Sequence, residues 1–136
     1  MTWNGKRYED YLGIEDKLHI ECINYAHLYP QLLVHHSPME GKRSRFEQFK
    51  LKKLGSKAGF PDFICFDDVV ISESISYKGL VCEFKAIYED GTLGQLSNAQ
   101  QEWFEKFTKK GYLCVIIYTF DEFKKLMNEC YTLKSA

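Results

Sequence analysis

Two carboxylates and a lysine stand out because of their surroundings. Asp62 opens an apolar stretch after a Gly- and Pro-containing turn, and Glu83 and Lys85 lie inside a second apolar stretch at 79–86. Side chains alternate between faces in a strand, so Glu83 and Lys85 project the same way, about 7 Å apart along the chain. Because an unpaired buried charge costs several kcal/mol, Asp62 is the expected third member. Such a group indicates a hard-oxygen site for Mg²⁺ or Mn²⁺.

Each of these residues also has a purely structural interpretation. Asp is common in turns, which would explain Asp62 alone. Glu83 and Lys85 would also form an ordinary charge pair on a solvent-facing strand. The neighbouring His35 and His36 point to opposite faces of a strand, so they cannot chelate one ion from the same side.

The composition is that of a globular domain with one basic segment. The 136 residues, 45% hydrophobic and 27% charged, fit one domain with a substantial core. The net charge of −1 indicates no partner, but the segment 42–57 holds seven basic residues against one acid. This indicates nucleic-acid binding, with a solvated helix face as the alternative. The basic residues are Lys42, Arg43, Arg45, Lys50, Lys52, Lys53 and Lys57, and the acid is Glu47.

The five cysteines predict a reducing compartment. Their number is odd, no two of them form a CxxC motif, and three of them lie in apolar, strand-like runs. We interpret them as reduced, structural thiols, which predicts a cytoplasmic protein. The sequence shows no signal-peptide pattern and no apolar run of the roughly 18 residues that a membrane helix needs. We therefore predict no contact with a membrane.

The hydrophobic pattern predicts alternating helices and strands. Capping boxes at 97–100 and 119–122 mark the starts of the last two helices, and the unbroken apolar run 112–118 is typical of a strand covered on both faces. The order α-β-α-β-β-α-β-α predicts an α/β fold, with a central mixed four-stranded sheet flanked by helices. The expected elements are an arm at 1–13, helices at 14–28, 43–54, 97–111 and from 119 onward, and strands at 32–36, 62–66, 79–86 and 112–118, with a possible hairpin at 69–72.

The ordered motifs carry a family resemblance. Pro61–Asp62 followed by Glu83–Phe84–Lys85 resembles the PD-(D/E)XK nuclease signature. More narrowly, the chain resembles the virus-type replication–repair nuclease (VRR-NUC) family in its short stand-alone phage or bacterial form. The resemblance implies a restriction-endonuclease-like core and one nuclease domain over 14–136. The stretches that carry it are 41–44, 54–62, 79–85, 96–100 and 111–112.

The resemblance implies roles for particular residues. Asp62 and Glu83 would be metal ligands, together with the main-chain carbonyl of Phe84. Lys85 would be the catalytic lysine, and Gln100 a supporting polar residue.

The first helix and the loop before the basic segment match the family less closely. Glu15 falls where the family has an acid that reaches the metal, although Asp16 and Glu21 lie on the same helix. At 38–41 the chain has Pro-Met-Glu-Gly where relatives often have a Pro–Asn turn. A polar contact from that loop is therefore in doubt.

The implied function is that of a Mg²⁺- or Mn²⁺-dependent DNA endonuclease. The family implies cleavage of branched DNA such as four-way (Holliday) junctions in replication, recombination or repair, by a homodimer in a bacterial or phage-infected cell and without a small-molecule cofactor. The alternatives are a nucleic-acid-binding module that keeps the fold with weak or no catalysis, and an interaction protein. The expected DNA-binding residues are Lys42, Arg43, Arg45, Lys52, Lys53 and Lys57.

Overall fold

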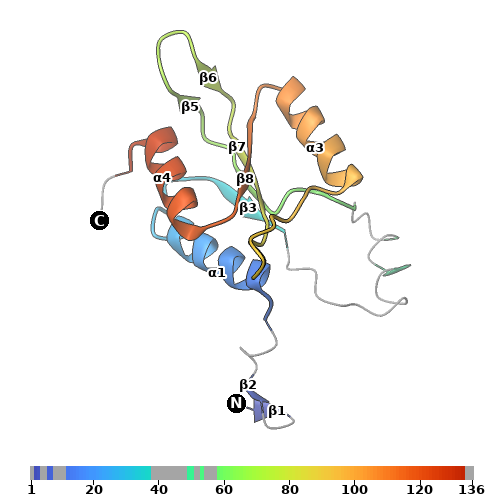
Figure 1. Cartoon of the computed structure of the whole chain (residues 1–136). Coiled ribbons are helices and arrows are strands. Elements are labelled where there is room, and N and C mark those ends of the chain that lie inside the picture. The colour runs from blue at the N-terminus through green and yellow to red at the C-terminus, as the bar shows by residue number, and fades with distance from the viewer. Residues whose placement is uncertain are drawn as a thin grey trace.

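The computed structural model describes residues 12–37, 49–50, 53 and 58–133, and the short paired strands β1 (Thr2–Trp3) and β2 (Lys6–Arg7). Most of the arm expected at 1–13 and of the helix expected at 43–54 lies outside the described residues. The other described residues form a four-stranded sheet with helices on both faces and a separate two-stranded hairpin (Figure 1).

The central sheet has four strands in the order β3-β4-β7-β8. They are β3 (Val34–His36), β4 (Phe63–Cys65), β7 (Leu80–Phe84) and β8 (Leu113–Ile117). The first three pair antiparallel, and β8 runs parallel to β7. The prediction of a mixed four-stranded sheet is confirmed.

The strand predicted to be covered on both faces is instead the edge strand. β8 occupies one end of the strand order, and its first four residues are only partly buried. β7, which crosses the middle of the sheet, is buried throughout. The apolar run therefore did not identify the central strand: β8 is the more apolar of the two in sequence, yet it lies at the edge.

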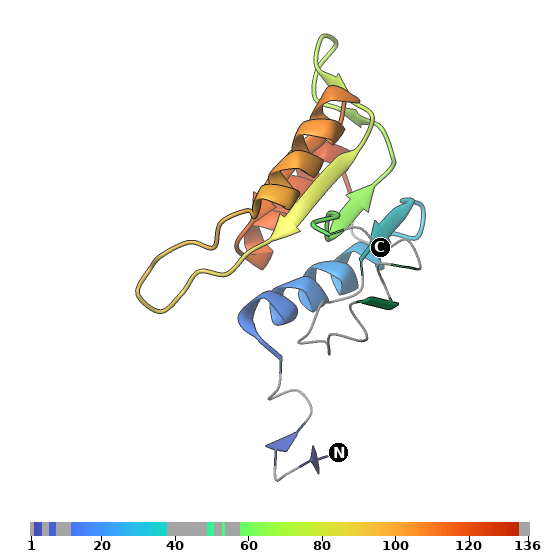
Figure 2. The same ribbon diagram turned by 90° about the vertical axis from the view of Figure 1, so that its right-hand side faces the viewer.

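Three described helices cover the sheet. They are α1 (Ile14–Ala26), α3 (Asn98–Lys109) and α4 (Phe120–Tyr131). α1 and α4 contact each other and pack on one face, where Cys82 and Phe84 of β7 join Phe123 and Met127 in the main core. α3 lies on the other face (Figure 2). α1 ends two residues before the predicted boundary at 28.

Local sequence signals explain where the last two helices begin. Ser97 accepts from the backbone N–H of Gln100 at 3.2 Å, and Gln100 Oε1 accepts from the N–H of Ser97 at 2.8 Å, so this capping box is confirmed. Thr119 likewise accepts from the N–H of Glu122 at 3.1 Å. The Glu122 carboxylate, however, accepts from the N–H of Tyr118 at 3.0 Å rather than from that of Thr119. Only half of the second predicted box forms, because Glu122 reaches one residue further back.

The connection between β4 and β7 contains a hairpin of β5 (Val69–Val70) and β6 (Ser76–Tyr77). It projects beyond the sheet (Figure 1). All five cysteines are free thiols, four of them buried. Within the described residues, no helix has the length and apolar character needed to cross a membrane.

Candidate active site

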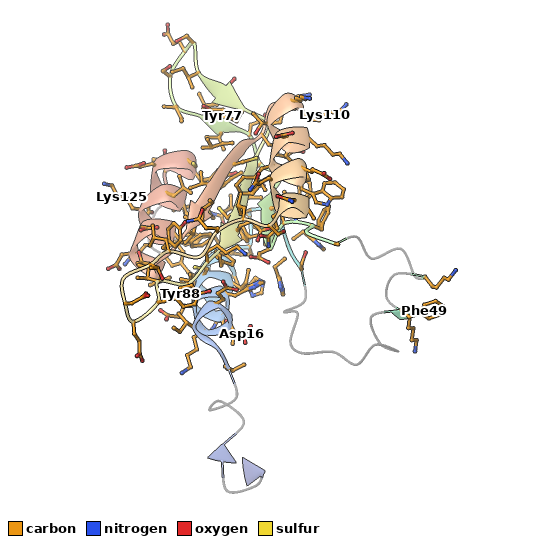
Figure 3. All side chains as sticks on the ribbon, turned by 45° about the vertical axis from the view of Figure 1, so that its right-hand side comes forward. Asp16, Phe49, Tyr77, Tyr88, Lys110 and Lys125 are labelled. Atoms are coloured by element: carbon orange, nitrogen blue, oxygen red, sulfur yellow. The ribbon has the colours of Figure 1, made fainter. Side chains whose placement is uncertain are left out.

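A cavity of about 260 Å³ lies beyond the carboxyl end of β7. The N-terminal turns of α1 and α3 both reach it. Figure 3 shows Asp16 in the lower part of the main body and Lys110 well apart from it, at the upper end of α3. A helix N-terminus favours anions, so α3 directs the positive end of its dipole toward the cavity. The lining residues are Glu15, Asp16, His19, Ser37, Gly59, Phe60, Asp62, Phe84, Lys85, Ser97 and Gln100.

The turn before β4 holds Asp62 against β7. Asp62 Oδ2 accepts from the N–H of Phe84 at 2.9 Å, and the carbonyl of Asp62 accepts from the N–H of Ser37 at 2.9 Å. The turn needs a glycine: Gly59 has φ +75°, and a Cβ there would lie 2.7 Å from the carbonyl carbon of Ala99. The turn thus packs directly on the start of α3.

Glu83 is a buried carboxyl group, only 1% exposed. Its Oε2 accepts from Gln100 Nε2 at 3.3 Å, whereas Oε1 is buried and has no hydrogen-bond partner within the described structure. Burial, and then the nearby Asp62, raise the pKa of Glu83 to about 9. Burial and the neighbouring Asp62 therefore both disfavour the ionised form of Glu83 in the metal-free protein.

Gln100 serves the helix and the cavity at once. Its Oε1 accepts from Ser97, as the capping box requires, which turns its Nε2 toward Glu83. Lys85 is partly buried, lines the same cavity, and is held by its N–H donating to the carbonyl of Ile117 at 2.9 Å. The structure therefore brings together Asp62, Glu83, Lys85 and Gln100.

The acids of α1 line the cavity from another side. Asp16 Oδ2 accepts from the N–H of Gly13 at 3.0 Å and so caps the helix, whereas Glu15 borders the cavity. Across the part of the chain that the structure describes, no three His, Cys, Asp or Glu side chains gather closely enough to hold a metal ion. Glu15 thus reaches the cavity without forming a three-carboxylate cluster with Asp62 and Glu83.

The structure adds cavity residues that the motifs did not indicate. Ser37 donates through its hydroxyl to the carbonyl of Pro61 at 2.8 Å. His19 is 6% exposed, and its Nε2 has no hydrogen-bond partner among the described residues. Burial lowers the pKa of His19. The only sequence signal for His19 is its position four residues after Glu15, on the same side of α1.

Most of the basic segment 42–57 lies outside the described residues. Lys53 is exposed, with its ammonium 5.6 Å from the centroid of the Phe49 ring. The prediction that this segment binds DNA therefore stays a prediction. The other five predicted DNA contacts, Lys42, Arg43, Arg45, Lys52 and Lys57, lie outside the described residues.

The mixed four-stranded sheet, the flanking helices and the acidic strand end define a restriction-endonuclease-like fold. The family model for the VRR-NUC domain matches residues 6–120, and the chain belongs to this family. A solved structure described as a VRR_NUC domain protein is similar, with a TM-score of 0.65 and 25% identity, over 91% of this chain and 93% of that chain. The comparison with curated proteins gave no match.

Proposed function

We propose that this nuclease domain is a Mg²⁺- or Mn²⁺-dependent DNA endonuclease that hydrolyses phosphodiester bonds. Its active site would be formed by Asp62, Glu83 and Lys85. Membership of the VRR-NUC family implies nuclease activity on nucleic acid. The observation that carries the finer proposal is Glu83, a carboxyl group almost completely removed from solvent with one oxygen unpartnered. A purely structural role would favour an apolar side chain here, since buried polar groups without partners are destabilising.

The donor set around Glu83 fits a hard divalent cation. Asp62, Glu83 and the main-chain carbonyl of Phe84 offer the oxygen ligands that Mg²⁺ and Mn²⁺ prefer, and Glu15 lies near enough to line the same cavity. When bound, the cation would supply positive charge for the phosphate and make water more acidic. The unpartnered Oε1 of Glu83 supports this proposal because a cation would provide its missing partner.

The protein's own groups would then have distinct tasks. The N–H of Phe84 fixes one oxygen of Asp62, and Gln100 fixes one oxygen of Glu83, so both carboxylates are oriented before substrate binds. Lys85 lines the cavity, where its ammonium would offset the negative charge that grows on the phosphate during attack. The N-terminus of α3 would favour the phosphate electrostatically.

The test is a nuclease panel with linear duplex, single-stranded, flap and four-way-junction DNA, with and without Mg²⁺ or Mn²⁺. We expect cleavage only with metal, and loss of cleavage in Asp62→Asn and Lys85→Ala. Binding without cleavage under every condition would instead identify a nucleic-acid-binding module that keeps the fold. Cleavage in a chelator would contradict the metal requirement.

For substrate and assembly, we propose preference for four-way junctions and a homodimer. This follows from the resemblance to stand-alone family members and from geometry: one cavity acts on one strand at a time, and symmetric cutting needs two sites related by a two-fold axis. Light scattering over a concentration series should give twice the 16.0 kDa chain mass. A monomer that cuts opposed strands of a junction at matched rates would contradict the dimer.

A further inference from the structure

The side of α1 toward the cavity is polar in its first two turns. Glu15, Asp16 and His19 all line the cavity, and side chains three or four positions apart share one face of a helix. One turn further on, Cys22 and Ile23 belong to the buried core. This side of α1 therefore changes from polar to apolar where the helix leaves the cavity. His19 is the polar residue on this side that lies nearest to the core.

The packing around His19 does not use its polar atom. The ring makes a tilted contact with Phe84, at 4.9 Å between centroids, and an edge contact with His36, at 5.8 Å. An apolar side chain could make both contacts. Nε2 is buried without a hydrogen-bond partner among the described residues, although buried polar atoms in folded proteins are nearly always bonded. This unpartnered atom destabilises the free protein, so a role in binding would explain why it is there.

We propose that Nε2 of His19 donates a hydrogen bond to a non-bridging oxygen of the substrate phosphodiester, from the α1 side of the cavity. This inference rests on the proposed function and adds a third side to the site, since Lys85 directly follows β7 and Gln100 comes from α3. His19 lines the cavity from α1, and the N–H group of an imidazole ring is a hydrogen-bond donor.

The first experiment compares three folded variants in single-turnover cleavage of a four-way junction. His19→Leu should cleave about ten- to a hundredfold more slowly, as expected for losing one hydrogen bond to a charged group. Its melting temperature should rise, because the unpartnered nitrogen is gone. His19→Gln, whose amide can still donate, should recover part of the rate. His27→Gln is the matched control, since His27 is exposed at the end of α1 and does not line the cavity.

A second experiment does not depend on cleavage. Lys85→Ala protein, labelled with ¹⁵N at its four histidines, is titrated first with Mg²⁺ and then with the junction. The Nε2 resonance of His19 should shift on addition of DNA, with little change on Mg²⁺ alone. This measurement and His19→Gln decide the matter even if His19→Leu fails to fold.

The outcomes separate this inference from the proposed function. Wild-type rates in folded His19→Leu, or a His19 resonance that does not move on addition of DNA, would overturn the role of His19 while leaving the nuclease proposal intact. If wild-type protein cleaves no DNA with any metal, the proposed function fails, and the DNA titration still shows whether His19 contacts the phosphate.

Discussion

The two faces of β7 are equally buried but differ in chemistry. Cys82 and Phe84 point into the core between α1 and α4, and they are 0% and 2% exposed. Glu83, on the α3 side of the same strand, is 1% exposed and carries an unpartnered oxygen. Burial therefore does not distinguish core from site on this strand. The difference is whether the buried group has found its partner within the protein.

This contrast separates stability from activity. The apolar face gains free energy of folding from every group that it buries. The α3 face loses free energy of folding because Glu83 is buried beside Asp62. The ionised form of Glu83 is disfavoured by its burial and by repulsion from the Asp62 carboxylate. Mutations on the two faces should accordingly affect different measurements.

The sharpest test of the contrast is Glu83→Ala. We expect cleavage to fall by about three orders of magnitude or more, since an interaction made with the reacting centre is lost. The melting temperature without metal should stay level or rise. Val81→Ala is the matched control, because Val81 is a fully buried residue of the same strand outside the main core cluster. It should lose about 2 kcal/mol of stability and keep its activity when folded. If Glu83→Ala cleaves DNA at the wild-type rate, the α3 face of β7 is not part of the active site.

Phe123→Ala should do the reverse. Phe123 is fully buried and makes T-shaped contacts with Phe63 and Phe84, at 5.2 and 5.8 Å between centroids. Its truncation should lower the free energy of unfolding by about 3–5 kcal/mol, measured by urea denaturation. The folded fraction should still cleave near the wild-type rate at low temperature. A folded but inactive variant would show that the two faces are not independent.

Glu83→Gln sharpens the comparison through pH. The pKa of Glu83 is about 9 in the folded protein against an ordinary value of 4.5, so between these values only the folded state keeps the proton. The wild-type free energy of unfolding should therefore fall as pH rises through this window, relative to the variant. By pH 8 the metal-free variant should be more stable by several kcal/mol, because each pH unit in this window changes the difference by about 1.4 kcal/mol. Below pH 4.5 the difference should vanish.

Two controls accompany this titration. Val81→Ala should show a stability difference from wild type that does not change with pH. Saturating Mg²⁺ should stabilise wild type more than Glu83→Gln, since binding to the folded state adds stability. Parallel pH curves for wild type and Glu83→Gln would contradict the buried, protonated carboxyl group.

Gln100→Ala should have the smallest effect. We expect about 1 kcal/mol of lost stability from the capping box, together with a loss of activity of about tenfold because Glu83 is no longer oriented. Ser97→Ala breaks the same box but leaves the donor of Glu83 in place. Ser97→Ala should lose about as much stability as Gln100→Ala but less activity. If both variants lose the same activity, the role of Gln100 is limited to capping the helix.

Sequence patterns predicted the parts of the site that depend on short-range order. Strand alternation placed Glu83 and Lys85 together, and the Ser97 capping box was readable from residue spacing alone. His19 and Ser37 were missed because their environment is created by packing of segments far apart in the chain. The edge position of β8 was missed for the same reason, since strand order is a long-range property that an apolar run does not encode.

The contact between Gly59 and α3 has a consequence for local opening. α3 has no fully buried residue of its own, so less packing holds it to the sheet than holds α1 or α4. Its first turn touches the backbone of the turn before β4 with no side chain between them. The two segments should therefore detach together as one low-energy unit, detectable by hydrogen exchange. On warming, the enzyme would lose its active geometry several degrees before the sheet itself melts.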